Sequence, residues 1–170
     1  DDRKSFIVGL KSNKLLIKEK KFLIKHKPWG IILFSRNIKN ITQVKKLTDE
    51  IRKIFNDKKY PILIDQEGGR VNRLRKFFNA DKLTGEFFGN LYLKDKKKFY
   101  TEYKKFIDKT ALLLKSLGIN INTLPVLDVR SKGSSSIIGD RAFSTNAKIV
   151  SQIGDICIQE LHNNKIATVI

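Results

Sequence analysis

The sequence has little of several features on which other classes of protein depend. It holds one cysteine, Cys157, so no disulfide can form within the chain. Cys157 lies in a helical pattern, so we expect a buried, inert thiol and a reducing, cytoplasmic compartment. No apolar run approaches the roughly 20 residues that a helix needs to cross a bilayer. The chain opens with Asp1-Asp2-Arg3-Lys4, without an initiator Met or an apolar signal segment, and a processed chain or a fragment is expected.

Acidic residues are also few. The 170-residue chain has 35 Lys and Arg against 17 Asp and Glu, a net charge of +18. Such a balance can indicate nucleic acid or an anionic membrane as partner. The lysines, however, are spread along the chain, and the densest run, residues 94–98, contains Asp95. We therefore expect a solvated basic surface, with no specific nucleic acid and no membrane as partner. A basic nucleic-acid-binding module is the weaker alternative, since no recognised binding motif is present.

The apolar pattern alternates between short strand-like runs and longer helical stripes. Strands are expected at residues 5–10, 30–34 and 60–64, within 119–129, and from 166 onward. Helices are expected at 14–27, from a capping Thr42 to Phe55, from Phe99 to Leu117, and along the stripe of Val150, Ile153, Cys157 and Leu161. Residues 66–97 and 131–136 are rich in Gly, Asn, Lys or Ser and are expected to form loops.

This order of strands and helices predicts an α/β protein with parallel strands and crossover helices. Both a doubly wound sheet and a (β/α)₈ barrel satisfy it. Polar residues directly follow three of the strands, at 35–37, 65–67 and 128–130, and barrel active sites are built on that rim. We therefore expect a TIM (β/α)₈ barrel. A whole barrel needs about 250 residues, so residues 1–170, with about five β/α units, should form an incomplete, N-terminal portion.

The segment from Asp65 to Arg73 is the richest in chemistry. It follows a strand and holds two acids, two glycines and two arginines. Glycines let the backbone turn sharply, while the planar fork of Arg and the acceptor pair of Asp suit the hydroxyls of a sugar. A structural cluster of salt bridges is equally compatible with these residues. Phosphate binding is not indicated, because no Walker or Gly-x-Gly-x-x-Gly pattern is present and the acids would repel phosphate.

The stretch Ile64-Asp65-Gln66-Glu67-Gly68-Gly69-Arg70-Val71 resembles the signature of the glycoside hydrolase family 3 β-N-acetylglucosaminidases of cell-wall recycling. Three further segments resemble the same family in the same order, at residues 30–37, 125–129 and 138–144. The resemblance spans nearly the whole chain, and the β-glucosidases of the family lack this form of the signature.

The resemblance implies substrate-binding roles for Asp65, Arg73 and Arg141, with Asn72 where family members usually have Gln. It implies neither a metal nor a cofactor. It also places no catalytic residue in this chain. The family's Lys-His-Phe-Pro-Gly-His-Gly motif would follow the strand that begins at Ile166, so the His acid/base and the Asp nucleophile are expected beyond Ile170. Glu67 is then expected to be structural.

The implied activity is removal of non-reducing terminal N-acetyl-β-D-glucosamine from muropeptides by a retaining mechanism, in the complete protein. The two histidines, His26 and His162, match no position of the family and are expected at the surface. The alternative is a catalytically inactive sugar-binding or structural fragment. The sequence does not determine an oligomeric state.

Overall fold

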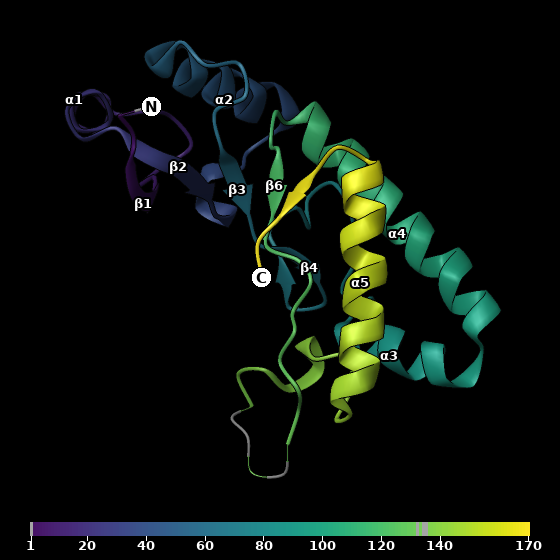
Figure 1. The fold of residues 1–170 in the computed structure, drawn as a ribbon. Coiled ribbons are helices and arrows are strands. Elements are labelled where there is room, and N and C mark those ends of the chain that lie inside the picture. The colour runs from purple at the N-terminus through teal and green to yellow at the C-terminus, as the bar shows by residue number, and fades with distance from the viewer. Residues whose placement is uncertain (1, 132, 134–135) are drawn as a thin grey trace. The chain divides into compact units, whose positions relative to one another are not determined.

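The computed structural model describes residues 2–131, 133 and 136–170, so part of the loop expected at 131–136 lies outside the described residues. In chain order, the elements are β1 (Lys4–Gly9), α1 (Ile17–His26), β2 (Pro28–Leu33), η1 (Ser35–Asn37), α2 (Ile41–Phe55), β3 (Ile62–Ile64), β4 (Gln66–Gly68), β5 (Val71–Asn72), α3 (Gly85–Lys94), α4 (Lys96–Ser116), β6 (Ile121–Asn122), η2 (Gly139–Arg141), α5 (Ala147–Asn163) and β7 (Ala167–Thr168) (Figure 1).

The elements group into two compact units. The sheet unit comprises the chain up to Ile64 together with residues 113–122, and the hairpin unit comprises residues 65–112 and 123–170. In the sheet unit β1, β2, β3 and β6 follow one another in that order, and every adjacent pair is parallel. This confirms the expected α/β class with parallel strands.

The central strands of the sheet unit are largely buried. Ile31 and Leu33 of β2 and Ile62 and Ile64 of β3 are fully buried, as expected of the continuous apolar runs of parallel strands. The strand expected within 119–129 is much shorter, since β6 ends at Asn122. Pro125, which has no N–H to donate to a ladder, follows three residues later.

Helix α2 follows its apolar stripe but begins differently from the expectation. Val44, Leu47 and Ile51 are buried, as the spacing predicts. The prediction that Thr42 caps the helix is wrong, because Asn40 is the N-cap and its Oδ1 accepts a hydrogen bond from the Gln43 amide at 2.8 Å. Asn is among the preferred N-cap residues, since its short side chain reaches the free amides of the first turn.

In the hairpin unit, the expectation of a loop over residues 66–97 is wrong. Part of it forms the β4–β5 hairpin, and residues 85–94 form α3, capped by Thr84. The sequence pattern did not indicate this helix, because it contains two glycines, which are unfavourable inside helices. A Cβ at Gly85 would lie 2.0 Å from the Arg141 carbonyl oxygen, and one at Gly89 would lie 1.7 Å from that of Phe143. These glycines therefore let residues 141–143 pack directly on the helix.

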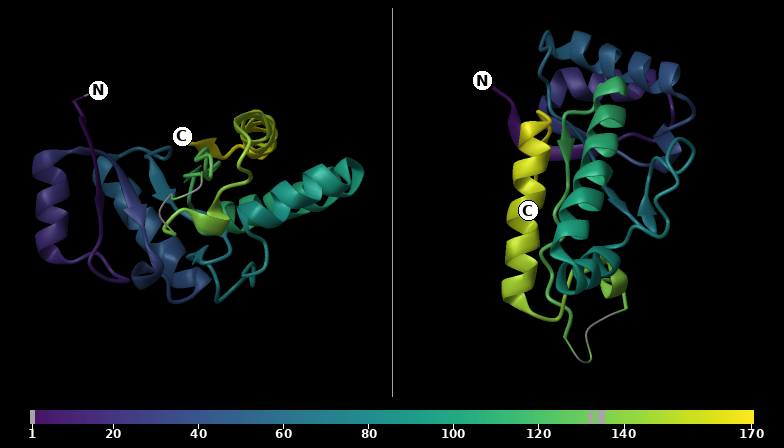
Figure 2. Two further views of the ribbon diagram at one scale, coloured as in Figure 1. Left: turned by 90° about the horizontal axis from the view of Figure 1, so that it is seen from below. Right: turned by 90° about the vertical axis from the view of Figure 1, so that its right-hand side faces the viewer.

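The core of the hairpin unit is aromatic. Phe88 of α3 packs edge-on against Tyr103 of α4 at a ring-centroid distance of 4.6 Å, and Tyr103 also meets Phe143. Helices α4 and α5 lie side by side (Figure 2), and the Asn164 amide donates to Asp108 at 2.7 Å. Such edge-to-face rings add to the free energy of burial.

Helix α5 buries the predicted stripe, including Cys157. Burial raises the pKa of the Cys157 thiol to about 12, so the thiolate form is rare at neutral pH. The expectation of a buried thiol is therefore confirmed by the position of Cys157 in the buried stripe. Within the residues that the structure describes, no helix is both long and apolar enough to cross a membrane.

Candidate functional site

The β4–β5 hairpin carries the signature segment. Its strands pair antiparallel. The turn between them contains Gly68 and Gly69 at φ of 93° and 55°, a backbone region that residues other than glycine rarely adopt. The buried Gln66 amide donates to Asn72 Oδ1 at 2.9 Å, and its oxygen accepts from the Leu74 amide at 3.0 Å. These two buried amides fix the hairpin and place Asp65 and Arg73 at its two ends.

Asp65 directly follows β3 and is held at both carboxylate oxygens. Oδ1 accepts a hydrogen bond from the Thr123 hydroxyl at 2.9 Å, and Oδ2 accepts one from Arg73 Nη2 at 3.2 Å. The side chains of Asp65 and Arg73 are 22% and 28% exposed, so solvent reaches both. A carboxylate has about four acceptor positions, and Asp65 therefore keeps acceptor capacity for a ligand.

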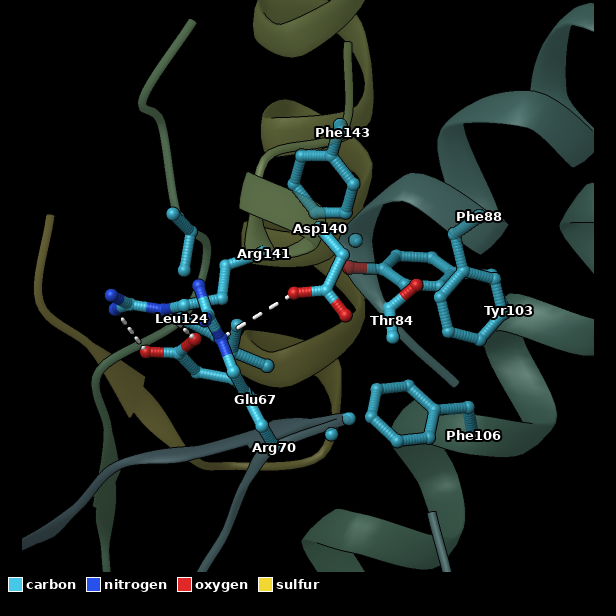
Figure 3. Close-up of a pocket in the computed structure, with 14 residues that line it drawn as sticks. Glu67, Arg70, Thr84, Phe88, Tyr103, Phe106, Leu124, Asp140, Arg141 and Phe143 are labelled. Carbon is cyan, nitrogen blue, oxygen red and sulfur yellow. Dashed lines mark hydrogen bonds and ion pairs between the residues drawn. The ribbon is translucent and has the colours of Figure 1, made fainter. Parts of the chain in front are cut away.

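Arg141 ends the 3₁₀ helix η2, and Glu67 of β4 holds it. Its Nε donates to Glu67 Oε2 and its Nη2 to Oε1, both at 2.8 Å (Figure 3). The hydrogen bond to Glu67 raises the pKa of Arg141 above its ordinary value, so the guanidinium is always charged. The three predicted residues thus come from different elements: Asp65 follows β3, Arg73 follows β5 of the hairpin, and Arg141 lies in η2.

Arg70 forms hydrogen bonds with the backbone of residues 136–138, which precede Arg141. Its Nη2 donates to the carbonyl oxygens of Ser136 at 2.8 Å and Ile138 at 3.0 Å, and also to that of Ile137. Its Nε lies 3.4 Å from Asp140 Oδ1 (Figure 3). The signature segment thus contacts the 136–141 segment twice, through Glu67 and through Arg70.

Asp65, Arg73 and Arg141 all border one open cleft of about 590 Å³ within the hairpin unit. The cleft also has polar lining from Glu67, Thr123 and Asp128, and apolar lining from residues such as Val126 and Leu127. A cavity of this size suits a small ligand such as a monosaccharide. A second, enclosed hollow beside Glu67 measures about 10 Å³ and is too small for a sugar.

Sequence reasoning named three residues of the cleft and missed Thr123. Asp65 and Thr123 are 58 positions apart, and nothing in the local pattern around Thr123 marks it. The polar run after the fourth expected strand did contain Asp128, which lines the cleft, although no role was assigned to it.

Neither histidine is among the residues that line the cleft. His26 is half-buried against Phe22 in α1, with ring centroids 4.6 Å apart. His162 is exposed near the end of α5, where its Nε2 lies 3.4 Å from the Thr168 hydroxyl. Among the described residues, no group of three or more His, Cys, Asp or Glu side chains is placed to hold a metal ion.

The parallel sheet and the arginine–carboxylate cleft define an α/β protein with a site suited to a polyhydroxylated ligand. Residues 7–170 match the Glycosyl hydrolase family 3 N terminal domain. The chain therefore belongs to glycoside hydrolase family 3, and the resemblance drawn from the four segments is confirmed.

Named relatives agree with this membership. The chain is 32% identical over 163 residues to a beta-hexosaminidase of Hydrogenovibrio crunogenus, covering 96% of this chain and 45% of that protein. The structure of NagZ from Neisseria gonorrhoeae in complex with N-trifluoroacetyl-D-glucosamine matches with a TM-score of 0.86 and 29% identity, covering 98% of this chain and 48% of that one. The chain therefore spans about half the length of the relatives that it matches.

A further solved structure is similar in the same way. A family 3 beta-N-acetylglucosaminidase from Paenibacillus matches with a TM-score of 0.79 and 26% identity, covering 96% of this chain and 30% of that one. The chain thus shares the mostly parallel α/β fold of these enzymes.

Proposed function

We propose that the protein containing this chain is a β-N-acetylhexosaminidase that removes non-reducing terminal N-acetyl-β-D-glucosamine. The observation that carries the proposal is the cleft, in which Asp65, Arg73 and Arg141 lie around one ligand-sized space in a family 3 chain. Its support includes relatives named beta-hexosaminidase and a NagZ structure whose ligand is an N-acylated glucosamine.

The chain is, in this proposal, the N-terminal portion of a (β/α)₈ barrel domain, with about five of the eight β/α units. The parallel order of β1, β2, β3 and β6 supports it, as does the run of helices between these strands along the chain. Polar lining at strand exits, such as Asp65 after β3, is the arrangement on which barrel active sites are built.

Within the cleft, the residues of this chain bind and orient the sugar. Asp65 accepts hydrogen bonds from sugar hydroxyls with the lone pairs that Thr123 and Arg73 leave open, while Arg73 and Arg141 donate to sugar oxygens. The net charge of the two arginine–carboxylate pairs is zero, which suits a neutral sugar.

Bond cleavage belongs, in this proposal, to residues beyond Ile170. An Asp nucleophile there forms a glycosyl intermediate and a His acts as acid/base, giving retention of configuration. No residue of this chain is assigned a chemical step. Positioning alone has a large effect on rate, since a misplacement of about 1 Å can lower it about 100-fold.

The proposed biological substrate is a GlcNAc-containing muropeptide released during peptidoglycan recycling, and the proposed compartment is the cytoplasm. The lone buried thiol of Cys157 is compatible with a reducing compartment. No metal, cofactor, nucleic-acid or membrane partner forms part of the proposal. Several lysines on α4 have acidic neighbours, as in the Lys104–Glu160 and Lys105–Glu102 pairs.

The test compares the full-length protein with the 170-residue chain on chromogenic N-acetyl-β-glucosaminide and β-glucoside. We expect turnover of the first substrate by the full-length protein, the β-anomer as first product by NMR, and no turnover by the chain alone. An inactive full-length protein that still binds GlcNAc would favour a sugar-binding role instead. Turnover by the purified chain would contradict the assignment of catalysis to residues beyond Ile170.

A further inference from the structure

Glu67 is the most enclosed charged group of the cleft, with only 8% of its side chain exposed, against 24% for its partner Arg141. Both of its oxygens lie 2.8 Å from nitrogens of that guanidinium. Each oxygen is thus in a short, charge-assisted hydrogen bond. Because the Glu67 carboxylate is also almost enclosed, its remaining lone pairs are poorly accessible to the hydroxyls of a ligand.

The same contact leaves Arg141 with N–H groups that Glu67 does not use and whose direction is defined. A guanidinium has five N–H donors in one plane. Glu67 takes those of the edge formed by Nε and Nη2, and Nη1 makes a long contact of 3.4 Å to the Ile137 carbonyl oxygen. Because the group is rigid and planar, fixing that edge also fixes the direction of the other edge, formed by Nη1 and Nη2.

The backbone beneath Arg141 is held as firmly as its side chain. Arg70 binds the carbonyl oxygens of residues 136–138. On the other side, Gly85 of α3 approaches the Arg141 carbonyl so closely that a Cβ there would lie 2.0 Å from its oxygen. Arg70, Gly85 and Glu67 therefore restrain Arg141 from three directions, and Glu67 makes the two shortest contacts with the guanidinium itself, at 2.8 Å against 3.4 Å for the Ile137 carbonyl oxygen.

We propose that Glu67 is a positioning residue, which orients the Arg141 guanidinium so that the edge formed by Nη1 and Nη2 donates to a sugar oxygen in the cleft. The inference rests on the proposed function and deepens it. Glu67, the second acid of the signature, then has a role in sugar recognition that is distinct from catalysis and from stabilisation of the loop. Since Glu67 does not touch the sugar, its effect on sugar recognition must pass through Arg141.

The experiment uses the full-length protein and the variants Glu67→Gln, Glu67→Asp and Arg141→Ala, with Glu86→Gln as the matched control. Glu86 also forms an ion pair with an arginine of the same unit, Arg130, but does not line the cleft. For Glu67→Gln we expect a higher KM and a kcat/KM about 10- to 100-fold lower. For Glu67→Asp, which keeps the charge, we expect an intermediate loss.

The double variant separates positioning from general stabilisation. In the Arg141→Ala background, Glu67→Gln should cause no further loss of kcat/KM, because its effect passes through the absent guanidinium. Additive losses would overturn the inference, as would a KM for Glu67→Gln that matches wild type and Glu86→Gln. If Glu67→Gln does not fold, the KM of Glu67→Asp decides in its place, an unchanged value overturning the inference. An inactive wild-type protein would instead count against the proposed function.

Discussion

Two arginine–carboxylate pairs line the same cleft but are built differently. Asp65 and Arg73 meet through one contact of 3.2 Å, and Asp65 has a second partner in the Thr123 hydroxyl. Glu67 and Arg141 meet through two contacts of 2.8 Å, with Glu67 almost enclosed. The first pair leaves its acid accessible to a ligand, while the second encloses its acid and leaves N–H groups of the arginine for a ligand. The same two chemical groups thus suit opposite tasks, depending on which partner stays accessible.

The difference follows from exposure and geometry, since each acid accepts two hydrogen bonds. An ionised carboxylate offers about four lone-pair positions. At Asp65, which is 22% exposed, Thr123 and Arg73 use two of these positions and solvent reaches the carboxylate. The bidentate geometry at Glu67 matches two lone pairs to two parallel N–H groups, which is the strongest form of this pairing. An acceptor site and a donor site therefore lie in one cleft without a net charge between them.

The largest effect is expected for Asp65→Ala in the full-length protein. The change removes the open acceptor of the cleft and leaves Arg73 without its carboxylate, so kcat/KM for an N-acetyl-β-glucosaminide should fall about 100-fold or more. Steady-state kinetics would measure this. The control is Asp81→Ala, which breaks the exposed pair with Arg75 in the same unit and should leave kcat/KM unchanged. Equal activity of the two variants would mean that Asp65 does not bind substrate.

The next effect comes from replacing each arginine of the two pairs by lysine. An ammonium group can replace the contact of Arg73 to Asp65, but it cannot form the bidentate contact to Glu67 and still present a fixed edge. We expect Arg141→Lys to lower kcat/KM about 10- to 100-fold and Arg73→Lys to lower it distinctly less. Parallel kinetics on the two variants test this. Equal losses would show that the two geometries do not differ in function.

A smaller effect, on stability, is expected from Gly89→Ala. The added methyl group meets the Phe143 carbonyl oxygen, 1.7 Å from the ideal Cβ position. Since this neighbour is backbone, the 141–143 segment or α3 has to move, and the free energy of unfolding should fall by about 1–3 kcal/mol. Urea unfolding measures it. Asn90→Ala, at an exposed position of the same helix, should be neutral or slightly stabilising. A Gly89→Ala protein as stable as wild type would contradict the close packing.

That glycine also shows where sequence patterns failed. Short continuous apolar runs correctly predicted strands within 30–34 and 60–64, and a stripe at helical spacing correctly predicted the buried face of α2. Helix α3 was missed because Gly85 and Gly89 weaken its local pattern. Glycine is required at these two positions because residues 141–143 pack against them, more than 50 positions away in the sequence. No local sequence window includes both α3 and that segment.

The cleft was predictable to a similar extent. The family resemblance points to Asp65, Arg73 and Arg141, and all three line the cleft, although their binding role stays a prediction. Their supports were not predictable from local pattern. The Glu67–Arg141 pair joins residues 74 positions apart. Only the folded chain shows which acid faces which arginine, and therefore which of them has open hydrogen-bonding capacity.

The smallest effect should come from Thr123→Val. Valine keeps the shape of threonine but removes the hydroxyl that donates to Asp65 Oδ1 at 2.9 Å. The Arg73 contact remains, so Asp65 loses one of two restraints. A hydrogen bond of this kind contributes about 1 kcal/mol, and kcat/KM should therefore fall about fivefold, mainly through KM. Thr123→Ser should restore most of the loss, because serine keeps the donor. Thr101→Val, on the exposed surface of α4, serves as control. If Thr123→Val is fully active, Asp65 is oriented by Arg73 alone, and the two pairs differ less than their geometry indicates.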